Sequence, residues 1–119
     1  MSQGVIDQVR PADLNQWFER AAADASGTPL LLDVREPAEW QAASVPADGF
    51  AVLMIAMGNV PQRLAELDPD RPIACLCHHG ARSHRVAAFL VQNGFAHVAN
   101  VAGGIDAWSI ERDRGVPRY

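Results

Sequence analysis

The chain has 119 residues, 49% of them hydrophobic, which is enough for one hydrophobic core and too short for two. Its formal net charge of -4 at pH 7 excludes the basic surface that binding to nucleic acid requires. All 10 basic residues are arginine, and the absence of lysine excludes Schiff-base chemistry and the lysine of a phosphate-binding loop. We therefore expect a single domain over residues 1–119 that does not bind nucleic acid.

The N-terminal segment lacks a charged leader followed by an apolar run, and no segment approaches the ~20 apolar residues of a membrane span. The two cysteines of the chain, Cys75 and Cys77, are one residue apart, a spacing that strains a disulfide. We expect both to be free thiols in a reducing compartment. The sequence thus predicts a soluble, cytoplasmic protein with no membrane partner.

Strand-like and helix-like segments alternate along the chain. Apolar runs of strand length predict strands at residues 4–9, 29–34, 50–53, 72–77 and 97–101. Amphipathic segments with helix start and stop signals predict helices at residues 11–25, 36–43, 61–67, 81–93 and 104–113. This alternation is typical of an α/β fold with a mainly parallel sheet and helices on both faces.

The stretch CHHGARS, Cys77 to Ser83, lies between a predicted buried strand and a predicted helix. In sheets of this kind, ligands bind beyond the carboxyl ends of the strands. The backbone N–H groups of the loop can form an anion-binding nest, the helix adds its positive end, and Gly80 lets the loop bend. These donors would stabilise a thiolate at Cys77, so we interpret Cys77 as a nucleophile that holds or attacks an anion.

The two thiols are expected to differ in their surroundings. Cys77 could be a buried structural thiol, but the polar residues that follow it favour a position at the end of the strand. Cys75 is flanked by Ala74 and Leu76 and is expected to pack in the core.

The remaining side chains of the loop also have alternative interpretations. The adjacent His78 and His79 do not have the spacing of a structural zinc site, so we expect them to line the pocket and no metal to be bound. Arg82 is expected to bind a carboxylate or a substrate oxyanion instead of lying in solvent. Ser83 is a candidate N-cap of the next helix.

Three motifs resemble those of the single-domain rhodaneses, sulfurtransferases that carry sulfur as a cysteine persulfide. CHHGARS resembles their active-site loop, and DVREPAEW (33–40) and GGIDAW (103–108) match two further family motifs in the same order. The resemblance extends from about Val5 to the end of the chain. It implies a rhodanese-like α/β fold, in which a central parallel five-stranded sheet has helices on both faces.

The resemblance also implies roles for individual residues. Cys77 matches the catalytic cysteine, and Asp33 and Arg35 match an acidic and basic pair that supports the loop. The chain departs from the family at residues 43–48, where ASVPAD replaces Gly-His-Ile-Pro-Gly-Ala, and residues 48–57 form a longer segment than in close relatives. The residues implied to surround the substrate are His78, His79, Gly80, Ala81, Arg82 and Ser83.

The implied reaction moves sulfane sulfur from a donor such as thiosulfate to cyanide or a thiol through a Cys77 persulfide, with no metal or organic cofactor. A protein that accepts the sulfur is a further expected kind of partner. One alternative is a persulfide carrier or interaction module without turnover, and another is a phosphatase or arsenate reductase of the same fold. The phosphatase is less favoured because four residues separate Cys77 from Arg82, where such phosphatases have five.

Overall fold

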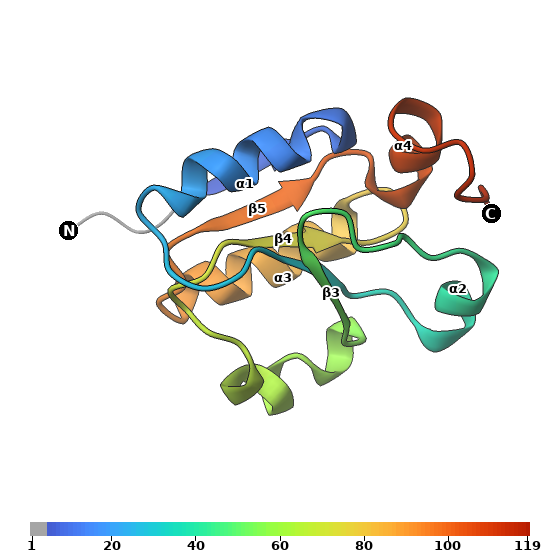
Figure 1. Ribbon diagram of the computed structural model, residues 1–119. Coiled ribbons are helices and arrows are strands. Elements are labelled where there is room, and N and C mark those ends of the chain that lie inside the picture. The colour runs from blue at the N-terminus through green and yellow to red at the C-terminus, as the bar shows by residue number, and fades with distance from the viewer. Residues whose placement is uncertain (1–4) are drawn as a thin grey trace.

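The computed structural model describes residues 5–119 and contains a five-stranded sheet in the order β1-β5-β4-β2-β3. Every pair of neighbouring strands is parallel, as the sequence predicted. Helices lie against both faces of the sheet (Figure 1). The part of the chain that precedes residue 5, where the first strand was predicted to begin, lies outside the described residues. The strands are β1 Ile6–Val9, β2 Leu30–Asp33, β3 Ala51–Met54, β4 Ile73–Leu76 and β5 Val98–Val101.

The predicted helices are also present, but two of them differ in length or type. The α-helices are α1 Leu14–Ala22, α2 Pro37–Ala42, α3 Ala81–Gln92 and α4 Gly104–Glu111, and 3-10 helices form at Pro11–Asp13, Met57–Asn59 and Pro61–Glu66. The first helix ends before the predicted residue 25, because the chain turns back and the Ser26 N–H donates to the Asp70 carbonyl over 3.0 Å. The segment after Pro61 was predicted as a helix, and it takes the tighter 3-10 form over Pro61–Glu66.

The core has two halves because side chains alternate between the two faces of each strand. Leu31 faces α1 and α4, where it joins a cluster that includes Trp17 and Trp108. Leu30 and Leu32, its neighbours in β2, face the opposite way, toward the helix α3. The central strands are therefore buried on both faces, which explains their continuous apolar runs. Within residues 5–119, no helix has both the length and the apolar character needed to cross a membrane.

The three sequence motifs meet at the carboxyl edge of the sheet. Strand β2 pairs with β4, with Asp33 opposite Leu76, so the DVREPAEW segment leaves the sheet beside the loop that begins at Cys77. Helix α4, from the GGIDAW motif, begins against that loop. The N–H of Ile105 donates to the Cys77 carbonyl over 2.9 Å, and the N–H of Asp106 donates to the His78 carbonyl over 3.2 Å. The first turn of α4 thus holds the backbone of the loop.

We predict that Gly104→Ala destabilises the protein by at least about 3 kcal/mol. Gly104 has a φ of +62°, and a Cβ there would lie 2.6 Å from the Cys77 carbonyl oxygen and closer still to the His78 carbonyl. Such an overlap requires the loop to move away from α4. The free energy of unfolding in denaturant measures the effect.

The matched control is Gly94→Ala. Gly94 also has a positive φ, of +89°, but a Cβ there would meet nothing within 4 Å. This substitution should lower the free energy of unfolding by only about 1–2 kcal/mol, the strain of a side chain in the left-handed region. Equal losses in the two variants would contradict the close contact between α4 and the loop.

Candidate active site

The thiol of Cys77 lies at the start of the loop, between the end of β4 and the beginning of α3. Its Sγ accepts a hydrogen bond from the Gly80 N–H over 3.1 Å, and the Ser83 Oγ lies 3.2 Å from it. Gly80 has a φ of +111°, a conformation that glycine adopts without steric cost, and this turns its N–H back toward the sulfur. Cys77 is 1% exposed, so the loop and its neighbours enclose the sulfur almost completely.

The prediction that Ser83 is a helix N-cap is wrong, because Gly80 occupies that position and Ser83 lies inside the first turn of α3. The residue type suggested a cap, but the left-handed backbone at Gly80 starts the helix three residues earlier. The Ser83 hydroxyl instead lies between Sγ and the side chain of Asn100, with its Oγ 2.5 Å from the Asn100 Oδ1. Ser83 therefore contacts the sulfur directly.

Asn100, which the sequence motifs did not point to, is a polar residue of the buried strand β5 and is 3% exposed. Its Nδ2 donates to the Gly80 carbonyl and to the Gln8 Oε1, each over 3.1 Å. With Nδ2 directed at these two acceptors, the Oδ1 of the same amide faces the Ser83 hydroxyl. All three contacts therefore require the same orientation of the amide group. The side chain of Gln8 continues to His84 at 3.0 Å, so a chain of polar contacts runs from the loop to the surface. A lone asparagine in an apolar strand was the signal that could have identified this support.

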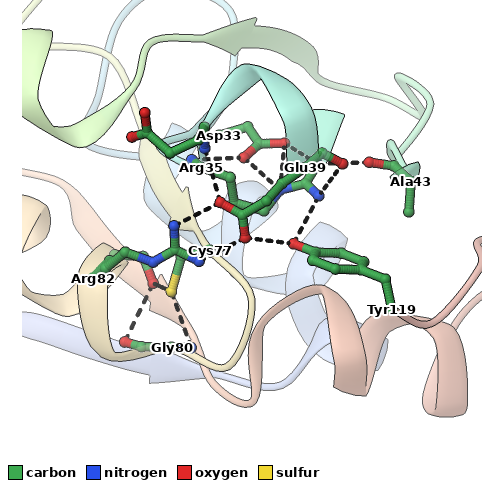
Figure 2. A network of polar contacts seen from close by, with 10 residues as sticks. Asp33, Arg35, Glu39, Ala43, Cys77, Gly80, Arg82 and Tyr119 are labelled. Atoms are coloured by element: carbon green, nitrogen blue, oxygen red, sulfur yellow. Dashed lines mark hydrogen bonds and ion pairs between the residues drawn. The ribbon is translucent and has the colours of Figure 1, made fainter. Parts of the chain in front are cut away.

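Arg82, which we expected to bind a carboxylate or a substrate oxyanion, is paired with a carboxylate of the protein itself. Its Nη1 and Nη2 donate to the two carboxylate oxygens of Glu39 over 2.7 and 2.8 Å. Figure 2 shows the two side chains meeting above Cys77. The hydrogen bond from Arg82 is the main cause that lowers the pKa of Glu39 to about 2, with smaller contributions from the Glu36 backbone and Tyr119. The carboxylate that binds Arg82 is thus supplied by α2.

Asp33 and Arg35 form a fully buried ion pair at the end of β2. The Arg35 Nη2 donates to the Asp33 Oδ2 over 2.6 Å, and both side chains are 0% exposed. The same guanidinium donates to the carbonyls of Glu39 at 3.1 Å and Ala43 at 2.9 Å, and to the Tyr119 hydroxyl at 3.0 Å. Ala43 belongs to the segment that departs from the family pattern, but its contact uses the backbone. The pair thus ties α2 and the C-terminal segment to the sheet beside the loop.

Comparison with known proteins agrees with this arrangement of motifs. The family model of the rhodanese-like domain matches residues 11–111. The chain belongs to this family. It is 39% identical over 80 residues to a sulfurtransferase of Allochromatium vinosum, an alignment that covers 67% of this chain and 71% of that protein. It is 30% identical over 89 residues to the thiosulfate sulfurtransferase GlpE of Pseudoalteromonas translucida, covering 75% of this chain and 81% of the other.

A solved structure also supports the rhodanese-like fold. A rhodanese-related protein of Thermoplasma volcanium superposes with a TM-score of 0.71 and 28% identity, over 89% of this chain and 93% of the other. The predicted family and fold are therefore confirmed, and the sulfurtransferase relatives support a rhodanese-type enzyme.

In this rhodanese-like domain, the two histidines of the loop form part of an aromatic stack. The rings of His78 and His79 have centroids 3.9 Å apart, and the Tyr119 ring lies 4.0 Å from His78 on an almost parallel plane. The Nε2 of His78 is buried without a hydrogen-bond partner among residues 5–119. Nothing in the sequence indicated that Tyr119, the last residue of the sequence, would cover the loop.

The histidines also lie near Asp106, with possible metal-ligating atoms of the three residues within 4.8 Å of one another. Imidazole nitrogens and a carboxylate oxygen are common metal ligands, so these three residues form a cluster of possible ligands. The Asp106 carboxylate is also paired with Arg118 at 2.8 Å. The ion pair with Arg118 competes for the Asp106 carboxylate, and catalysis without metal or cofactor remains a prediction.

Cys75 lies in the core, as predicted. It is 0% exposed within β4, and burial is the main cause that raises the pKa of its thiol. A thiol that stays protonated is a poor nucleophile. Among the cysteines, only Cys77 thus lies beside the polar groups of the loop.

The Glu39–Arg82 pair predicts a pH dependence of stability. A carboxyl group with a lowered pKa stabilises the folded protein above its ordinary value of 4.5, and this contribution is lost as the pH falls toward about 2. As the pH falls through this range, we expect the free energy of unfolding of wild type to decrease by about 1–3 kcal/mol more than that of Glu39→Gln, whose side chain does not titrate. Denaturant unfolding at several pH values measures both proteins, and parallel pH profiles would contradict the pairing.

Proposed function

We propose that this protein is a sulfurtransferase in which Cys77 carries the transferred sulfur as a persulfide. The observation that supports this most directly is the surroundings of the Cys77 Sγ, which faces the Gly80 N–H and the Ser83 hydroxyl at the beginning of α3. N–H groups at a helix beginning favour negative charge, both on a thiolate and on a persulfide. The sulfurtransferase names of the relatives agree with this chemistry.

The proposed reaction has two steps. The Cys77 thiolate attacks the outer sulfur of a donor such as thiosulfate, and the sulfur–sulfur bond of the donor breaks so that sulfite leaves with the electron pair. A thiolate or cyanide acceptor then attacks the outer sulfur of the persulfide, and the Cys77 thiolate is released. The two steps need no external oxidant or reductant, and the donors of the loop stabilise the negative charge in both.

Two features of the loop disfavour phosphate as the substrate. Only four residues lie between Cys77 and Arg82, one fewer than in phosphatases with a comparable loop. The Arg82 guanidinium, which such an enzyme would use to bind two phosphate oxygens, already binds both oxygens of Glu39. A single sulfur atom on Cys77 needs neither a longer loop nor a free arginine.

We predict that Cys77→Ser abolishes sulfur transfer and that Cys75→Ser retains most of it. A serine hydroxyl is a much weaker nucleophile at neutral pH and cannot carry a persulfide, whereas Cys75 is buried away from the loop. After treatment with thiosulfate, mass spectrometry should find about 32 Da added to Cys77. The same mass on Cys75 would show that the assignment is wrong.

A paired assay separates sulfur transfer from phosphate hydrolysis. Wild type should transfer sulfur from thiosulfate to cyanide and should not hydrolyse aryl phosphates, and Cys77→Ser should do neither. Hydrolysis that disappears in the variant, without sulfur transfer in wild type, would replace the proposal with a phosphatase. If Cys77 gains sulfur but does not turn over with cyanide or small thiols, the protein is a persulfide carrier, the alternative left open by the sequence.

A further inference from the structure

Arg82 is the one arginine of the loop, and the position of its charge determines how the site attracts anions. Both of its Nη atoms are bound by Glu39, and the two side chains are 32% and 20% exposed. A bidentate pair of this kind is short, charge-assisted and geometrically specific. An anionic donor that needs Arg82 must therefore compete with a carboxylate that is already in place.

Glu39 is held in this position from several sides. Its Oε2 also accepts the Glu36 N–H over 2.9 Å, which fixes the carboxylate to the first turn of α2. Its Oε1 accepts the Tyr119 hydroxyl over 2.9 Å. The backbone carbonyl of Glu39 accepts a hydrogen bond from the buried Arg35. Figure 2 shows these contacts as one connected network beside Cys77. Glu39 is thus a fixed part of the site and differs from a freely moving surface carboxylate.

The second arginine near the loop is neutralised in the same way. Arg35 pairs with Asp33, and both side chains are fully buried. The two arginines beside Cys77 are therefore matched by two carboxylates, and the attraction for an anion comes from backbone N–H groups and the beginning of α3. Those groups can stabilise a single charge on sulfur, but they do not supply a free cation for the distal oxygens of a dianion.

We propose that Glu39 is a specificity-determining residue that disfavours dianionic sulfur donors. The favoured donor class is a thiol persulfide with little charge around its sulfane sulfur, and thiosulfate is a usable but poor donor. This inference rests on the proposed function, in which Cys77 accepts the sulfur. The negative charge of Glu39 acts through Arg82, because it cancels the field that Arg82 would otherwise exert at the Cys77 sulfur.

Two alkylating reagents test this charge balance without any sulfur transfer. Iodoacetate and iodoacetamide have similar size and differ in one negative charge, so the ratio of their rates at Cys77 reports the local potential. We expect Glu39→Gln to raise the iodoacetate:iodoacetamide ratio about 3- to 10-fold at low salt, and added salt to reduce this gain. The control is Glu36→Gln, which removes one charge from the same end of α2 and should leave the ratio almost unchanged.

Sulfur transfer provides the second measurement. Glu39→Gln should raise kcat/KM for thiosulfate by a similar factor, and Glu36→Gln should not. An unchanged alkylation ratio in a folded Glu39→Gln protein, or an equal change in both variants, overturns the inference. If Glu39→Gln does not fold, the wild-type ratio decides: we expect it to lie within about threefold of the ratio for a small free thiol, and a ratio raised about tenfold would overturn the inference.

The two proposals fail in different ways. A raised ratio in Glu39→Gln, with no sulfur on Cys77 in any variant, overturns the proposed function and with it the assignment of a sulfur donor. Sulfur transfer with an unchanged ratio overturns only the role of Glu39.

Discussion

The buried guanidinium of Arg35 is the constraint on which the rest of the site depends. It is 0% exposed, so every N–H that it presents must be satisfied by the protein. Asp33 supplies the compensating charge from the end of β2, and carbonyls at Glu39 and Ala43 supply acceptors at each end of the last turn of α2. Without the carbonyls of Glu39 and Ala43, buried N–H groups of Arg35 would lack acceptors at a cost of about 1–3 kcal/mol each, so α2 has to lie against the end of the sheet.

The position of α2 then determines the electrostatics of the loop. Because the backbone of Glu39 is held by Arg35, its carboxylate can reach Arg82 on α3. The loop itself is held mainly through its backbone: α4 binds the carbonyls of Cys77 and His78, and Asn100 binds the carbonyl of Gly80. Side chains outside the loop therefore determine the electrostatic potential around it, whereas contacts to its backbone determine its conformation.

The parts of the structure that depend on local sequence could be predicted. Strands buried on both faces appear as continuous apolar runs, and the change from apolar to polar residues at Cys77 located the loop at the end of a strand. Ser83 was misinterpreted because the residue type alone favours a cap, while the left-handed backbone at Gly80 decides where α3 begins.

Contacts between distant segments could not be predicted in this way. Glu39 resembles any acidic residue of a short surface helix until Arg82 is placed opposite it. Tyr119 is 80 positions from Glu39 in the sequence, and only the tertiary structure brings its hydroxyl to that carboxylate. The charge balance of the site is therefore a property of the fold, which the loop motif does not reveal.

The most direct test of Cys77 as the sulfur carrier is a crystal structure of the protein after incubation with thiosulfate, with sulfur located by anomalous scattering. We expect one additional sulfur bonded to the Cys77 Sγ, surrounded by the N–H groups of the loop, with the Glu39–Arg82 pair still formed. An unmodified Cys77 with sulfur on another residue, or an intact oxyanion bound to Arg82 in place of Glu39, would contradict it.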